Sequence, residues 1–295
     1  SSDWQDPTNW STTGPPGPPD NTTDVTIFSG TPFQPVLTAN AATSDFTMAS
    51  GTTLAMGAYD FNVKGKFSNN GGAFTSTGTV TLSATTGTNT VDPGTSSFYN
   101  LTVASAIGYS SSRAINITND FVITSGSKFT IANAAHTLTI GNNWTSTGAT
   151  FTHGNGTVVF NKNSGTCSLT TGAAGAGGVT FYNLSVIQAL GSPVSTKTQT
   201  LTGNLTVTRT LLISSSKCVF SCGTGNIVNI NGTLTFGNGA TLAGGSSTLN
   251  VSGSWLNNIG APFSYGTSTV LFNGVSAQTI TRSTATGETF YNVTI

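Results

Sequence analysis

The sequence FYNLTV at residues 98–103 recurs as FYNLSV at 181–186 and as FYNVTI at 290–295. The second half of each copy alternates between polar and apolar residues, which is the period-two pattern of a strand with one buried face. A six-residue phrase that is used three times in one chain indicates an architecture built from structural repeats.

The same signals precede each copy of the phrase. A glycine-flanked aromatic residue comes first, at Phe67, Trp144 and Trp255, and a strand valine follows it after 13, 14 and 15 residues in turn. An interval that lengthens by one residue from copy to copy is typical of stacked coils whose corners vary in length.

The copies differ in length by about one unit of structure. The interval from Phe98 to Trp144 is 46 residues, whereas the interval from Phe181 to Trp255 is 74, an excess of 28. A solenoid accepts a whole extra coil easily because each coil contacts only its neighbours. We therefore predict an all-β, elongated β-solenoid (β-helix-like) of stacked coils of roughly 20–25 residues. Tandem β-sandwich repeats are the alternative.

The composition excludes several classes of function. Only 6% of the residues are charged, and nine basic and nine acidic side chains give a formal net charge of zero. An ordinary soluble domain has about 25% charged residues. So few Lys and Arg residues do not form the basic patch that binds nucleic acid or acidic lipid. No stretch approaches the roughly 18 continuous apolar residues of a membrane span, so we expect neither nucleic-acid binding nor membrane insertion.

Two parts of the chain differ in composition. Residues 1–24 hold Trp4, Trp10 and the PPGPP sequence at 15–19, which favours an extended polyproline segment. We interpret this part as a Pro-rich N-terminal arm or cap. The remainder, 25–295, is predicted to be a solenoid of three long repeats at about 25–103, 104–186 and 187–295.

Residues suited to catalysis are few and dispersed. Glu288 is the only Glu, and Asp45, Asp60, Asp92 and Asp120 fall in separate predicted coils with no His nearby in the sequence. Acid–base chemistry needs carboxylates or a His gathered at one place. We expect no enzymatic activity, no cofactor and no metal site.

The three cysteines leave two interpretations open. Cys218 and Cys222 lie four residues apart in a strand-like run, and about 13 Å would separate their Cα atoms in an extended chain. That distance is too long for a disulfide bond, so they would pair only across a turn or with Cys167. The alternatives are three buried free thiols, or one disulfide with one thiol left over.

The order of motifs from Gly253 to Ile295 is Gly-Ser-Trp, Phe, a strand, Gln-Thr-Ile and the FYN phrase. It resembles the repeats of large secreted prokaryotic cell-surface proteins, and the opening DW, NW and DVTI motifs are similar to the starts of such regions. The resemblance covers nearly the whole chain and implies an adhesin-like or matrix scaffold. It implies no catalytic residues.

We expect an extracellular structural protein. The chain begins Ser1-Ser2-Asp3 without Met, as after removal of a signal peptide. At the other end the phrase is followed by no further strand, which predicts an unpaired edge open to strand addition. We therefore predict head-to-tail self-assembly into a filament or surface layer. The alternative is an adhesin or glycan-binding module of a larger surface protein, with glycans or other cell-surface proteins as partners.

The expected subunit contact combines apolar residues near the two termini. It comprises Trp4, Trp10, Val25, Ile27, Phe290, Tyr291, Val293 and Ile295.

Overall fold

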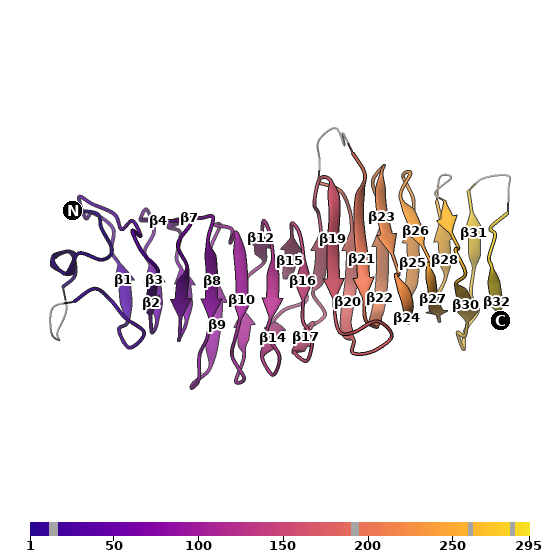
Figure 1. Cartoon of the computed structure of the whole chain (residues 1–295), viewed down its shortest axis with the longest axis horizontal. Coiled ribbons are helices and arrows are strands. Elements are labelled where there is room, and N and C mark those ends of the chain that lie inside the picture. The colour runs from indigo at the N-terminus through magenta and orange to yellow at the C-terminus, as the bar shows by residue number, and fades with distance from the viewer. Residues whose placement is uncertain (12–16, 190–194, 259–261, 284–286) are drawn as a thin grey trace.

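The computed structural model describes residues 1–11, 17–189, 195–258, 262–283 and 287–295. The chain forms a rod with its N-terminus at one end and its C-terminus at the other (Figure 1). Strands of each coil pair in parallel with those of the coils before and after, and about 12 turns are stacked in this way. The predicted β-solenoid is confirmed, and the alternative of tandem sandwiches is wrong because successive coils share continuous parallel sheets.

Each coil runs along three sides of the rod, which we number in the order in which the chain visits them. Side one is an eleven-stranded sheet. Its strands are β2 (Ala41–Thr43), β5 (Phe61–Val63), β8 (Thr79–Leu82), β10 (Asn100–Val103), β13 (Phe121–Ile123), β16 (Trp144–Thr145), β19 (Gly165–Thr170), β21 (Lys197–Thr202), β23 (Cys218–Ser221), β26 (Thr241–Ala243) and β29 (Phe263–Ser264).

Side two begins as a seven-stranded sheet. Its strands are β1 (Val25–Ile27), β3 (Phe46–Met48), β6 (Phe67–Asn69), β9 (Asn89–Asp92), β11 (Tyr109–Ser111), β14 (Lys128–Ile131) and β17 (Thr150–Thr152). Toward the C-terminus it continues in β24 (Thr224–Ile230), β27 (Ser246–Val251), β30 (Thr269–Phe272) and β32 (Asn292–Thr294).

Side three completes each coil. Its strands are β4 (Thr53–Gly57), β7 (Ala73–Ser76), β12 (Ile115–Ile117), β15 (Thr137–Ile140), β18 (Thr157–Phe160), β25 (Thr233–Phe236), β28 (Trp255–Asn257) and β31 (Ile280–Arg282). Two long strands, β20 (Val179–Val186) and β22 (Leu205–Ile213), run along sides two and three in turn. Their mutual pairing shifts register between Phe181 and Asn183, where the chain turns from one side to the next.

The interior consists of inward residues that stack in register from coil to coil. On side one, Leu101 pairs with Phe121, which pairs with Trp144, and all three are fully buried. The rings of Phe121 and Trp144 meet edge to face with 5.0 Å between their centroids, the geometry that aromatic quadrupoles favour. The alternation predicted from the sequence therefore places its apolar residues inside.

Corners are formed by residues that tolerate a left-handed backbone. Gly126 and Gly148 have φ angles of 77° and 71°, and the Gly126 N–H donates to the Gly148 carbonyl at 2.8 Å. Asn155 and Asn238 also have positive φ angles. Only glycine, and less readily Asn, adopts this conformation without strain, so these residues set where a coil turns.

A ladder of polar side chains joins successive coils at the corner that leads into side one. The Asn100 Oδ1 atom accepts a hydrogen bond from the Asp120 backbone N–H at 3.2 Å, and Asp120 Oδ1 accepts from the Asn143 N–H at 3.1 Å. Asn143 Oδ1 in turn accepts from the Ser168 N–H at 2.8 Å. The asparagine of the FYN phrase thus serves the corner of a coil.

The three copies of the phrase occupy three different corners. The first leads from side three into β10 on side one, the second from side two into side three within β20, and the third into β32 on side two. From Phe98 on side three to Trp144 in β16 the chain makes two coils and one further side, and from Phe181 on side two to Trp255 in β28 it makes three coils and one further side. The excess of 28 residues is therefore one whole coil, as the sequence predicted.

The N-terminal arm is joined to the solenoid. The Trp4 N–H donates to the Val36 carbonyl at 2.9 Å and the Val36 N–H to the Ser2 carbonyl at 2.7 Å, so residues 2–4 pair along side three. Of the expected polyproline run, Pro15 and Pro16 lie outside the described residues, and Pro19 is buried.

Replacing one inward side chain should cost far more stability than replacing its outward neighbour. We expect Phe121→Ala to lower the free energy of unfolding by about 3–5 kcal/mol because it leaves a cavity beneath Trp144. The matched control Val122→Ala, at an outward position of the same strand, should cost about 0.5 kcal/mol or less. Urea denaturation followed by tryptophan fluorescence measures both. Equal losses would contradict the assigned register.

Candidate functional site

The N-terminal end of the core is covered by the arm. Trp4 is fully buried and its ring centroid lies 5.4 Å from that of Phe61. Half-buried Trp10 packs on Trp4 with 4.7 Å between centroids, and its indole Nε1 donates to the Trp4 carbonyl at 2.8 Å. Between the two tryptophans lies η1 (Pro7–Asn9), whose N-cap Asp6 accepts from the Thr8 N–H. Hydrogen bonds from the Thr8 hydroxyl and N–H lower the pKa of Asp6.

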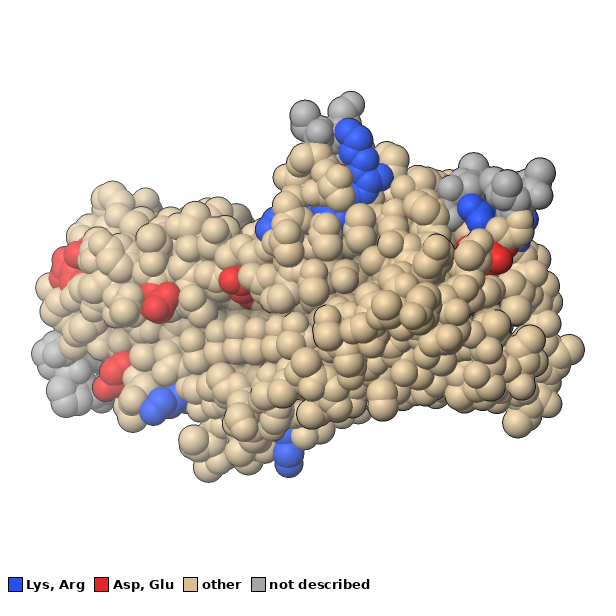
Figure 2. Space-filling view, turned by 45° about the vertical axis from the view of Figure 1, so that its right-hand side comes forward, with Lys and Arg blue, Asp and Glu red and all other residues tan. Residues whose placement is uncertain are grey.

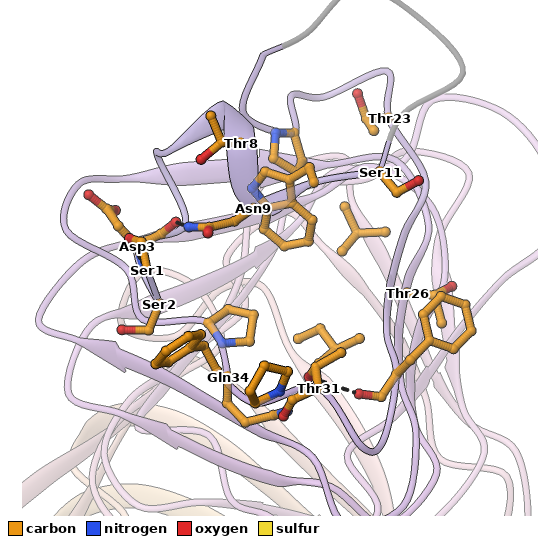
Figure 3. A pocket seen from close by; sticks show the side chains of 18 of the residues that line it. Ser1, Ser2, Asp3, Thr8, Asn9, Ser11, Thr23, Thr26, Thr31 and Gln34 are labelled. Atoms are coloured by element: carbon orange, nitrogen blue, oxygen red, sulfur yellow. Dashed lines mark hydrogen bonds between the residues drawn. The ribbon is translucent and has the colours of Figure 1, made fainter.

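An open recess lies beside this cover. Its volume is about 580 Å³, and the arm, β1 and residues 28–35 surround it (Figure 3). Trp10, Val25 and Ile27 contribute to its lining, and the rings of Phe28 and Phe33 stand at 66% and 61% exposure. Four of the predicted contact residues therefore lie at this end, with Trp4, Val25 and Ile27 buried and Trp10 half-buried.

The C-terminal end differs because inward positions there are uncovered. Phe290 packs on Trp255 at 5.3 Å and is partly buried. Val293 stands in register with the buried Val270 of β30, yet Val293 is 49% exposed and Ile295 is 93% exposed. Tyr291 is also exposed. The predicted contact residues thus fall into two groups, one at each end of the rod.

A buried carboxylate lies near this C-terminal end. Glu288 Oε2 accepts hydrogen bonds from Asn257 Nδ2 at 2.7 Å and from the Trp255 indole N–H at 3.2 Å. Its other oxygen lies 3.9 Å from Arg282 Nη1. The only Glu of the chain therefore anchors residues 287–290 across the last inward tryptophan.

Charge is distributed unequally along the rod. Residues 1–63 contain six Asp and no Lys or Arg, whereas residues 131–295 contain five Lys or Arg and one Glu. Figure 2 shows acidic side chains toward one end and mostly basic ones over the other half. The side-chain charges are thus −6 in the first segment and +4 in the last, although the whole chain is neutral.

Four acidic side chains bind backbone groups of the following coil. Asp24 Oδ1 accepts from the Asp45 N–H at 3.0 Å, and Asp45 Oδ1 accepts from the Lys66 N–H at 2.6 Å. Asp60 accepts from the Thr79 N–H, and Asp120 serves the ladder described above. These carboxylates hold corners together, and in the described part of the chain no group of three or more His, Cys, Asp or Glu side chains is placed to bind a metal ion.

A buried polar cluster interrupts the core where β19, β21 and β23 lie side by side. Lys197 is fully buried, and its Nζ atom donates to the carbonyls of Phe160 and Ile187, both at 2.6 Å. Cys218 is its register partner on β23, and Cys167 Sγ lies 3.0 Å from Gln199 Oε1. Burial lowers the pKa of the Lys197 ammonium to about 8.

All three cysteines are free and buried. Of the two open interpretations, the structure has the one without a disulfide. Burial raises the pKa of Cys218 to about 11 and that of Cys222 to about 12. Because the thiolate is the reactive form, such thiols are inert in the folded chain.

Sequence reasoning missed Lys197, the anchoring role of Glu288 and the division of charge. The division of charge was visible in the order of the residues. The burial of Lys197 had no such signal, because its strand KTQTLT alternates like a strand with an exposed polar face.

Comparison of the chain with protein-family models, with curated proteins and with solved structures finds no match. No helix within the described ranges is long and apolar enough to cross a membrane. The geometry of the chain itself is therefore the basis for inferring its function.

We predict that native protein does not react with a water-soluble disulfide reagent, whereas unfolded protein releases three thiols per chain. Ser221→Cys is the matched control because Ser221 lies between Phe220 and Cys222 on the outward face, and it should add one thiol that reacts in the native state. Reaction of a native thiol in the parent protein, or fewer than three thiols after unfolding, would contradict the structure.

Proposed function

We propose that this chain is a non-catalytic extracellular structural protein whose copies associate head to tail into a filament or surface layer. The observation that carries the proposal is the uncovered C-terminal end. There β32 pairs only with β30 among the described strands, and the inward side chains of Val293 and Ile295 meet solvent.

An uncovered end of a solenoid favours the addition of another strand. The backbone of an edge strand presents unpaired N–H and C=O groups, and an extended segment can satisfy them. Covering one large aliphatic side chain contributes about 1.5–3 kcal/mol. Both terms act at the same place here, so a second coil is the natural complement of this surface.

The two ends of the rod are different, and this determines what kind of assembly they support. A contact between the C-terminal end of one copy and the N-terminal recess of another is heterologous. Such a contact leaves both outer ends available, so it propagates unless rotation closes a ring. The parallel direction of all coils is then preserved from one copy to the next, which supports a filament with a single polarity.

The extracellular part of the proposal rests on other evidence. The repeats resemble those of secreted prokaryotic surface proteins, and the outward positions of the rod are dominated by uncharged residues. Such a surface supports a scaffold in contact with other chains or glycans.

A second candidate function is an adhesin or glycan-binding module of a larger surface protein. The exposed rings of Phe28 and Phe33 beside the recess favour it, because aromatic faces provide large rigid contact area. Binding of the monomeric protein to a glycan array would support this candidate.

Val293→Lys should prevent assembly, because a charged side chain at an inward position of β32 cannot be covered without a large desolvation cost. We expect the parent protein to form filaments in negative-stain electron micrographs and Val293→Lys to sediment as a monomer. Val275→Lys makes the same exchange at a fully exposed position outside the named strands and should assemble like the parent.

A parent protein that stays monomeric at high concentration would overturn the proposed function. Equal assembly of the two lysine variants would show that β32 is not part of the contact.

A further inference from the structure

We infer that the head-to-tail contact is an in-register continuation of side two, in which β32 of one copy pairs in parallel with β1 of a second copy. The inference rests on the proposed function and specifies its interface. It places Asn292 beside Asp24, Val293 beside Val25, Thr294 beside Thr26 and Ile295 beside Ile27 of the second copy.

The free backbone groups of the two strands are complementary in this register. The Val25 N–H donates to the Asp45 carbonyl and the Ile27 carbonyl accepts from the Ala49 N–H, so both residues face β3. By the alternation of a strand, the N–H and C=O groups of Thr26 point to the other edge. The Asn292 N–H donates to the carbonyl of Ser268, the residue before β30. The N–H and C=O groups of Val293 therefore point away from β30, toward the free end of the rod.

Three backbone hydrogen bonds follow from that arrangement. Val293 N–H meets the Asp24 carbonyl, Thr26 N–H meets the Val293 carbonyl, and Ile295 N–H meets the Thr26 carbonyl. The β1–β3 pair uses the same pattern, with the Val25 N–H on Asp45. A shift of one residue would turn the inward side chains outward, so the pattern admits only this register or shifts by two.

The side chains select between those registers. Residues 25–27 and 293–295 have the same sequence, Val-Thr-Ile, so the contact stacks identical side chains. Val293 and Ile295 would enter the recess that Val25 and Ile27 line. A shift by two residues would leave one of the two aliphatic side chains uncovered.

The corner ladder favours the same register. Asp24 and Asp45 each accept the backbone N–H of the following coil through a side-chain oxygen. Asn292 occupies the equivalent position before Val293, so its Oδ1 atom would accept from the Asp24 N–H. A shifted register would not bring these two residues together.

The charge distribution supports a second copy as the occupant of the recess. In the head-to-tail contact, the positively charged last segment of one copy lies against the acidic segment 1–63 of the next. A contact between two like ends would instead bring like charges together. Attraction of this kind guides approach over about 10 Å at moderate salt. It orients the copies and does not fix the register.

Engineered cysteines test the register. Thr26 and Thr294 are exposed and face outward, and their Cα atoms would lie about 4.8 Å apart in the contact, within the range of a disulfide bond. Under mild oxidation we expect Thr26→Cys/Thr294→Cys to form a ladder of covalent oligomers. The matched control Thr26→Cys/Asn292→Cys separates the two Cα atoms by about 8 Å and should remain uncross-linked. The parent, whose thiols are buried, supplies the baseline.

The outcomes separate the register from the proposed function. Filaments that cross-link through 26 and 294 but not through 26 and 292 support the inference. Filaments that form normally but cross-link through the control pair, or through neither pair, overturn the register and leave self-assembly standing. If the parent forms no filaments, both ideas fail, and a recess covered instead by other parts of a longer polypeptide becomes the explanation.

Discussion

Hydrogen bonds between successive coils hold this molecule together, because no coil satisfies its own backbone. Each strand both donates to and accepts from the coil before it and the coil after it, with alternate residues serving the two sides, so every strand depends on two neighbours. Inward side chains follow the same rule, as in the stack from Leu101 to Trp144. The corner carboxylates and amides extend it to polar groups, since Asp120 binds the backbone of the next coil. Stability is therefore a sum of contacts between neighbours, and the two ends are where that sum is incomplete.

The features predicted correctly from the sequence are those set by local pattern. Alternation placed Phe121 inside, and the unequal spacing of the aromatic signals revealed one additional coil. Both depend on residues close together in the chain. The three copies of the FYN phrase lie at three different corners, and this was not foreseen. Successive copies are separated by whole coils plus two further sides, and spacing alone does not reveal the two extra sides. The position of Lys197 also depends on strands far apart in sequence.

The buried cluster around Lys197 shows how the solenoid accommodates an irregular coil. β19 and β21 are each six residues long, and the first half of β21 carries Lys197 and Gln199 as fully buried inward residues. The Lys197 ammonium closes this extension by binding two carbonyl groups from neighbouring turns. Gln199 Nε2 has no hydrogen-bond partner among the described residues. The rod is thus widened locally, and the burial of polar side chains there lowers the stability of the fold.

The stacking of coils also has a mechanical consequence. A coil of about 22 residues occupies about 4.8 Å along the rod when folded, but the same residues span about 75 Å when fully extended. Tension applied between the two ends loads one layer of hydrogen bonds at a time, so coils would peel away singly. Each peeled coil would add more than ten times its own folded thickness to the length of the molecule, while the remaining coils stay folded. Under load the rod would therefore extend in discrete steps, one coil at a time.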